Sequence, residues 1–247
     1  MRNIKLILEY DGSRYDGWQK QSGNPKSITI QDKVESVLNK MDNETVNLIG
    51  AARTEAGVHA YGQVANFNTG TDMKPYEIKH YLNRFLPRDI AVLEAAEVPE
   101  RFHSSFNAKA FRYVYKISMG DVPSVFERKY NYYSFHKPDI IRMRKAAACL
   151  IGRHDFKAFS DNPRMKKSTE RTVNSIDIYS DINDMSITIE ADDFWPNMAR
   201  IIVGTLMAAG DGSMEPDYVK EIIESKDRLK AGTTAEARGL FLEEVIY

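Results

Sequence analysis

The first hundred residues alternate strand-like and helix-like segments in an order that restricts the possible folds more than any other feature. An apolar run from Ile4 to Tyr10 stops at the turn pair Asp11-Gly12, as expected of a buried strand. Residues 30–41 and 75–86 have helical periodicity. Three further segments are strand-like, namely residues 46–49, 62–67 and 90–98. The resulting order, β-α-β-β-α-β, predicts a split βαβ, ferredoxin-like unit.

The second half of the chain repeats this order more loosely. Tyr113, Tyr115 and Ile117 share one face of a strand predicted over residues 111–117. The other predicted elements are helices at residues 140–151, 196–209 and 216–225, a hairpin of residues 172–179 and 185–191, and a final strand at residues 240–247. We therefore expect an α+β fold of two ferredoxin-like halves, residues 1–105 and 106–247, with antiparallel or mixed sheets and a central cleft.

Composition excludes several classes of protein. Lys and Arg total 34 against 35 Asp and Glu, so the protein does not coat nucleic acid by bulk charge, and RNA binding would need a local basic patch. The single cysteine excludes an internal disulfide, and the five histidines lack the paired spacing of metal ligands. The sequence contains no signal peptide and no apolar stretch of membrane length, which favours a soluble, cytoplasmic protein.

The stretch GAARTEAGVHA at residues 50–60 is the most unusual part of the sequence, because it sets an Arg, a carboxylate and a His in a loop of small residues. Small residues allow a ligand or another backbone to approach closely, and loops on a rigid scaffold often carry function. One interpretation is therefore a functional site. The other is a simple turn in which Glu55 pairs with Arg53, and spacing alone does not choose between them.

This stretch resembles the signature R-T-D-A-G-V-H-A of the tRNA pseudouridine synthase A family. The resemblance continues through LEYDGSRYDGWQKQ at residues 8–21, GQVANF at 62–67 and PERFHSSFNAKAFRYVYKI at 99–117. Shorter matches follow in family order at residues 150–156, 197–200, 226–228 and 239–240. Several separate motifs in order along nearly the whole chain identify it as a member of this family.

The resemblance implies a pseudouridine synthase-type fold and an isomerase that converts uridine to pseudouridine in the tRNA anticodon arm. It also implies a homodimer that uses neither metal nor cofactor. In such enzymes a carboxylate acts at the ribosyl C1′ of a flipped-out uridine, the N-glycosidic bond breaks, and C5 of the turned uracil bonds to C1′. By motif position, Glu55 is the catalytic carboxylate and Arg53 helps to flip the base. Tyr113 stacks on the uracil, and Arg200 is a further cationic residue that binds the substrate.

Three residues or segments of this family pattern have an alternative interpretation. Tyr113 could be a core aromatic, since Tyr115 lies on the same strand face. His59 could be an acid–base catalyst, although the family assigns it no proton transfer, which favours a loop-stabilising hydrogen bond. The basic run at residues 164–171 could be a solvated face. The residues implied to contact RNA are Phe102, His103, Ser105, Phe106, Arg164, Lys166 and Lys167.

The chain also departs from the family pattern. Glu55 stands where the family has aspartate, and its extra methylene moves the carboxylate by about an ångström, a misplacement that can cost ~10²-fold in rate. Ser105 replaces an arginine, Met73 replaces a basic residue, and Phe194-Trp195-Pro196 is unusual. These departures leave open a diverged, catalytically weak or silent RNA-binding paralogue. They also leave open an enzyme that acts on a different RNA or on a small nucleotide.

Overall fold

The computed structural model describes residues 1–247 except 22, 25 and 163–167. The chain forms two compact units. Unit 1 consists of Met1–Lys109 together with Phe241–Tyr247, and unit 2 consists of Ala110–Leu240. No helix in the described part of the chain is long and apolar enough to cross a membrane.

The sheet of unit 1 has the strand order β4-β1-β3, with β2 and β10 both paired to β3. Its strands are β1 (Arg2–Tyr10), β2 (Ile49–Gly50), β3 (His59–Thr69), β4 (Ile90–Val98) and β10 (Leu240–Ile246). The pairs of β1, β2, β3 and β4 are antiparallel, whereas β10 runs parallel to β3. Alternation along β1 buries Ile4, Leu6 and Leu8 completely, which fixes the register of this central strand.

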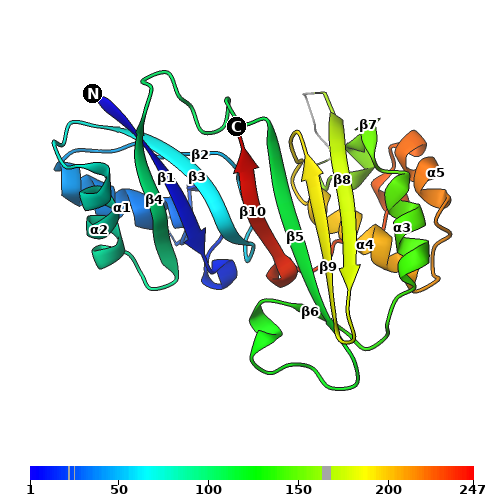
Figure 1. The fold of residues 1–247 in the computed structure, drawn as a ribbon. Helices are drawn as coiled ribbons and strands as arrows, with labels where there is room; N and C mark the ends of the chain where they lie inside the picture. The colour runs from blue at the N-terminus through cyan, green and yellow to red at the C-terminus, as the bar shows by residue number, and fades with distance from the viewer. Residues whose placement is uncertain (22, 25, 163–167) are drawn as a thin grey trace. The chain divides into compact units, whose positions relative to one another are not determined.

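Two helices, α1 (Ile30–Asp42) and α2 (Pro75–Phe85), complete unit 1 and lie together beside its strands (Figure 1). The Thr29 side chain caps α1 by accepting the Asp32 N–H. Pro75 begins α2, where the N–H that proline lacks would have no helical partner. The order β4-β1-β3-β2 with two crossover helices confirms the ferredoxin-like fold predicted for the first half.

Unit 2 is built on an antiparallel sheet of strand order β5-β9-β8-β7, with β6 parallel to β5. Its strands are β5 (Ala110–Met119), β6 (Tyr132–Ser134), β7 (Gly152–Asp155), β8 (Glu170–Ser180) and β9 (Asp184–Ala191). The expected β8–β9 hairpin is confirmed. β6 and β7 were not predicted, because three or four residues are too few to show an alternating pattern.

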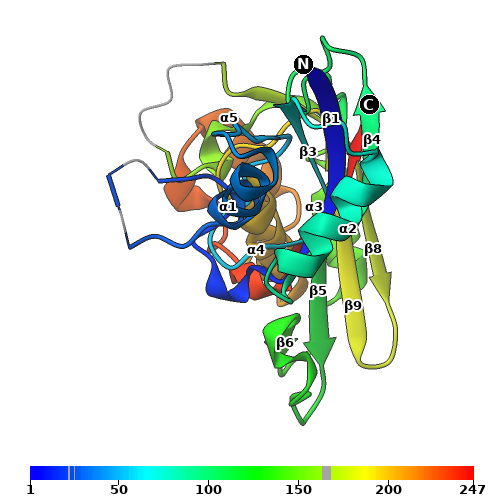
Figure 2. The same ribbon diagram turned by 90° about the vertical axis from the view of Figure 1, so that its left-hand side faces the viewer.

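Three helices lie on one side of this sheet (Figure 2), namely α3 (Ile140–Ala148), α4 (Met198–Gly210) and α5 (Tyr218–Ser225). α4 is almost entirely buried, as its apolar sequence predicts. It begins two residues later than expected, because Asn197 adopts the left-handed conformation with φ of 64°. The chain as a whole therefore has the α+β class and the antiparallel and mixed sheets expected from its sequence.

The last strand belongs to unit 1, although sequence order places it with the second half. Phe241 of β10 lies opposite His59 of β3, and Leu242 lies opposite Ala60. The Phe241 ring also stacks on the His59 and Tyr61 rings, at centroid distances of 4.6 and 4.8 Å. Unit 1 is consequently closed by residues from both ends of the chain.

Candidate functional site

The loop of residues 51–58, which we call the signature loop, leaves β2 and returns as β3. Its first residues stay paired with β3, since Ala51 N–H donates to the Val64 carbonyl at 2.7 Å. The Gln63 side chain then accepts the Ala52 N–H at 3.1 Å and donates to the Ala52 carbonyl at 2.8 Å. A buried glutamine thus imitates a strand partner and extends the ladder up to Arg53.

A second buried side chain holds the middle of the loop. The Tyr10 hydroxyl and the Thr54 hydroxyl are 2.7 Å apart, and both residues are buried. Burial raises the pKa of Tyr10 above its ordinary value, and the negative charge of Glu55 adds to this rise. Both effects favour the neutral hydroxyl that bonds to Thr54.

The loop is also packed directly against the backbone of an earlier segment. Trp18 N–H donates to the Thr54 carbonyl at 3.0 Å, and Gly57 N–H donates to the Tyr15 carbonyl at 3.2 Å. Between them, Gly17 has φ of 95°, and a Cβ there would lie 2.5 Å from the Thr54 oxygen. Only glycine allows this conformation and this approach, so Gly17 lets the two backbones touch beside Glu55.

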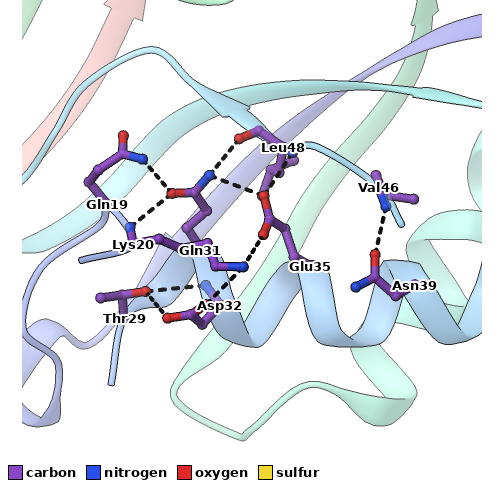
Figure 3. Close-up of polar contacts among 9 residues, drawn as sticks. All are labelled: Gln19, Lys20, Thr29, Gln31, Asp32, Glu35, Asn39, Val46 and Leu48. Carbon is purple, nitrogen blue, oxygen red and sulfur yellow. Dashed lines mark hydrogen bonds and ion pairs between the residues drawn. The ribbon is translucent and has the colours of Figure 1, made fainter. Parts of the chain in front are cut away.

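Helix α1 connects the two segments that flank the loop (Figure 3). The Gln31 side chain accepts the Lys20 N–H at 3.0 Å and donates to the Leu48 carbonyl at 2.9 Å. Glu35 accepts the Leu48 N–H at 3.0 Å and forms an ion pair with Lys20 at 2.9 Å. Two buried polar residues, one helical turn apart, therefore join the segment after Trp18 to the residue before β2.

The side chains of the two central loop residues differ in exposure. Glu55 is half-buried, whereas Arg53 is exposed and makes no ion pair or hydrogen bond with the described residues. The interpretation of the stretch as a turn closed by a Glu55–Arg53 pair is therefore wrong. The loop presents a carboxylate on a backbone held on both sides, together with a guanidinium that can engage a ligand without breaking an internal ion pair.

His59 lies at the end of the loop and is buried, with 1% of its surface exposed. Its Nδ1 atom accepts the Gly12 N–H at 3.1 Å. This is the loop-stabilising hydrogen bond expected from the sequence, and it ties the start of β3 to the turn after β1.

In unit 2, β5 presents both candidate tyrosines on one buried face. Tyr115 is fully buried and donates its hydroxyl to the Glu236 carbonyl at 2.9 Å, while burial raises its pKa. Tyr113 is 7% exposed, and its ring meets Phe194 edge-on with centroids 4.9 Å apart. Phe194 comes from the unusual segment before α4, so that segment contributes to the orientation of the Tyr113 ring.

Arg200 projects from the first turn of α4 and is half-buried. Its Nε donates to the Ala235 carbonyl at 2.6 Å, and an Nη donates to Asn197 Oδ1 at 2.9 Å. Asn197 in turn donates to Asp161, which forms an ion pair with Arg228 at 2.7 Å. Arg200 is thus oriented by a polar chain that links α4 to the segment of residues 228–235.

The other residues expected to contact RNA fall into two groups. Phe102, His103, Ser105 and Phe106 lie in the segment between β4 and β5, where the Phe102 ring packs on Tyr247 at 5.2 Å. Ser105 and Phe106 are exposed. Arg164, Lys166 and Lys167 lie outside the described residues.

Sequence reasoning missed the residues that support the signature loop. Four of them are polar side chains that are nonetheless buried, namely Tyr10, Gln31, Glu35 and Gln63. One signal was available: Gln31 and Glu35 occupy positions i and i+4 beside the apolar stripe of Ile30, Val34 and Leu38. Within the described part of the chain, no three His, Cys, Asp or Glu side chains are grouped so that they could hold a metal ion.

Comparison with known proteins decides the family. The model of a family described as tRNA pseudouridine synthase matches residues 6–107 and 146–247, which contain the signature loop and Arg200. The chain belongs to the tRNA pseudouridine synthase family. Tyr113 lies in the interval between the two matched segments.

Individual relatives agree with this assignment. The tRNA pseudouridine synthase A of Bacillus sp. (strain KSM-64) is 46% identical over 247 residues, and that of Acetivibrio thermocellus is 44% identical, each with complete coverage of both chains. Among solved structures, the archaeal box H/ACA sRNP Nop10-Cbf5 complex aligns with 92% of this chain and 59% of its own. Its identity of 10% and TM-score of 0.36 are too low to establish a shared fold.

Proposed function

We propose that the protein is an isomerase that converts uridine to pseudouridine in tRNA. The observation that supports the proposal is the position of Glu55. Glu55 is a half-buried carboxylate at the family's signature position, in a loop whose backbone is hydrogen-bonded to β3 and to residues 15–18. A carboxylate that acts at a sugar carbon must be held close to that carbon and in a defined orientation, and a fixed loop backbone provides this.

The reaction balances within the substrate itself. The bond between C1′ and N1 breaks, its electron pair leaves with the uracil, and the carboxylate of Glu55 acts at C1′. The uracil turns, C5 bonds to C1′, the C5 proton is lost and N1 gains one. The product is an isomer, so the step consumes no oxidant, reductant or cofactor.

The remaining roles follow from the positions of the other candidates. Arg53 is exposed and makes no internal ion pair, which suits a residue that enters the space left by an extruded base. Tyr113 offers a flat ring for the uracil, oriented by Phe194. Arg200 supplies positive charge for the phosphate backbone, together with Arg164, Lys166 and Lys167. Phe102, His103, Ser105 and Phe106 form a further RNA-contacting segment.

The proposal extends to the position modified in tRNA, the oligomeric state and the location of the protein. We place the modified uridines in the anticodon arm, the active form in a homodimer, and the protein in the cytoplasm. Mapping the modified positions and measuring the molecular mass by analytical ultracentrifugation test the first two.

The decisive experiment incubates the protein with unmodified tRNA and maps pseudouridine. We expect product from wild type, none from Glu55→Gln, and normal product from the control Glu44→Gln, which changes an exposed loop carboxylate. Glu55→Asp keeps the charge and should remain active. Product from Glu55→Asp with none from wild type would contradict native activity. RNA binding without product would instead identify a silent RNA-binding paralogue.

A further inference from the structure

Phe106 presents a large apolar ring to solvent, with 84% of its surface exposed. One face of this ring stacks on His103, with centroids 4.0 Å apart and planes inclined by 21°. Among the described residues 99–109, it is the one large apolar side chain that is exposed. Because the ring remains exposed to water after folding, it contributes little to the free energy of unfolding.

The turn that carries this pair is closed by hydrogen bonds. His103 Nδ1 accepts the N–H groups of both Ser105 and Phe106 at 3.2 Å. His103 N–H donates to Asn107 Oδ1 at 2.8 Å, and Asn107 N–H donates to the His103 carbonyl at 3.0 Å. The ring pair is therefore pre-organised, which lowers the entropy cost of binding a ligand.

The same turn is anchored to the strands that lead to the signature loop. Ser104 is fully buried, donates its hydroxyl to the Ile49 carbonyl at 2.6 Å, and donates its N–H to Asn66 Oδ1 at 2.8 Å. Ile49 and Asn66 are partners in the β2–β3 ladder. The pair of Ala52 and Gln63 lies three residues further along, about 10 Å by the rise of a strand.

The chemistry of the surroundings favours a nucleic acid base. A protein interface needs contiguous apolar area, which a single ring does not provide. A base, by contrast, stacks on one aromatic side chain. Arg101 is exposed and makes no ion pair with the described residues, so it is available for a phosphate. The small, exposed Ser105 leaves the approach to the ring open.

We propose that His103 and Phe106 form a stacking platform for an unpaired base of the RNA, distinct from the target uridine. This inference rests on the proposed function for the identity of the RNA. Asn3 at the start of β1 donates to the Phe102 carbonyl at 2.8 Å, whereas Tyr10 at the end of β1 contacts Thr54 of the signature loop. The platform and the signature loop therefore lie toward opposite ends of β1, so the platform engages a part of the RNA away from the target uridine.

The test measures binding separately from catalysis. Phe106→Ala should weaken affinity for unmodified tRNA about 5- to 150-fold, the range for loss of one base–aromatic stack. The slope of log affinity against log salt should not change, because no phosphate contact is lost, whereas Arg101→Ala should reduce that slope by about 0.7. Phe106→Tyr should retain affinity. Phe126→Ala is the matched control, since Phe126 is 88% exposed but lies in unit 2.

A spectroscopic arm reports stacking directly. Phe106→Trp should show fluorescence quenching, beyond that of wild type, when single-stranded oligouridylate or tRNA is added, whereas Phe126→Trp should not. Unchanged affinity in Phe106→Ala, equal losses in both alanine variants, or absence of extra quenching would each overturn the platform. Loss of self-association without loss of RNA affinity would assign Phe106 to a protein contact and overturn it as well.

Pseudouridine formation by wild type, assayed in parallel, separates the two proposals. If wild type is active and Phe106→Ala binds normally, the platform fails and the proposed function stands. If wild type is inactive but the quenching and affinity results hold, the platform stands and the proposed function fails.

Discussion

At the scale of single residues, the Glu55 carboxylate depends on neighbours that hold the backbone beside it. Thr54 precedes it and has both its carbonyl and its hydroxyl bonded, to the Trp18 N–H and the Tyr10 hydroxyl. The glutamate side chain has one rotatable bond more than the family's aspartate, so its carboxylate has more rotational freedom. A mobile backbone would increase this freedom further. The precision of the site is therefore shared between Glu55 and these supporting groups.

We expect Tyr10→Phe to lower kcat about 5- to 10-fold with a smaller change in KM. The substitution removes the hydrogen-bond partner of the buried Thr54 hydroxyl, which costs about 1–2 kcal/mol. Steady-state kinetics with unmodified tRNA check this. Tyr15→Phe is the control, because it deletes a hydroxyl bonded to Asp89 at 2.7 Å. An equal loss of kcat in both variants would show that Tyr10 acts through stability alone.

At the scale of elements, α1 holds two segments through polar contacts made by two of its buried side chains (Figure 3). Gln31 and Glu35 are each 5% exposed, and together they bond Lys20 and Leu48. A buried carboxylate is tolerated here because an ammonium group and a backbone N–H satisfy it. The arrangement couples the first turns of α1 to both approaches to the signature loop.

Replacing Glu35 tests this coupling. Glu35→Ala leaves the buried Leu48 N–H without its acceptor and removes one of the two carboxylates paired with Lys20, so we expect a loss of about 2–4 kcal/mol in the free energy of unfolding. Glu35→Gln keeps an acceptor for Leu48 and should lose less. Urea denaturation measures both. Lys40→Ala, on the exposed side of α1, should change stability by less than about 0.5 kcal/mol. A loss below 1 kcal/mol in Glu35→Ala would contradict this account.

The polar chain that holds Arg200 should make stability depend on acid pH. Burial opposes ionisation of Asp161, but the hydrogen bond and charge of Arg228, together with the hydrogen bonds of Asn197 and Thr234, outweigh it and hold the pKa of Asp161 below its ordinary value of 3.8. Because the pKa of Asp161 is lower in the folded than in the unfolded protein, its ionised carboxylate stabilises the fold above pH 4. This stabilisation is lost as the pH falls through the pKa of the folded state. Asp161 is 40% exposed, so the contribution is below about 1 kcal/mol.

We therefore expect Asp161→Asn to be less stable than wild type at pH 7, by a margin that shrinks as the pH falls from 4 toward 2. Urea denaturation across this range measures the difference. A difference that stays constant down to pH 2 would show that the loss comes from packing rather than from the carboxylate charge.

At the scale of the whole molecule, the two ends of the chain meet in unit 1. β10 contributes Phe241 and Leu242, which are 4% and 0% exposed, and pairs in parallel with β3. Parallel pairing of strands so distant in sequence closes a long loop, which is entropically costly and must be offset by burial. Unit 1 is for this reason not encoded by a single continuous stretch.

Ending the chain after Leu240 should destabilise unit 1 by more than about 4 kcal/mol, since truncation of each large buried apolar residue costs about 2–5 kcal/mol. Hydrogen exchange of the β3 amides should report the effect directly. Deleting Tyr247 alone, which removes a hydrogen bond to the Ser104 carbonyl at 2.7 Å, should cost far less. Unchanged protection of β3 without residues 241–247 would contradict this prediction.

The sequence by itself determined the order of helices and strands in unit 1, because apolar periodicity and caps such as Thr29 act over a few residues. It also determined the family, since ordered motifs such as residues 50–60 survive independently of their environment. Only the tertiary structure decided that β10 joins unit 1, that β7 extends the sheet of unit 2, and that Gln31 and Glu35 are buried. These features arise between residues far apart in the chain, and local periodicity carries no information about which distant groups will satisfy a buried strand edge or polar side chain.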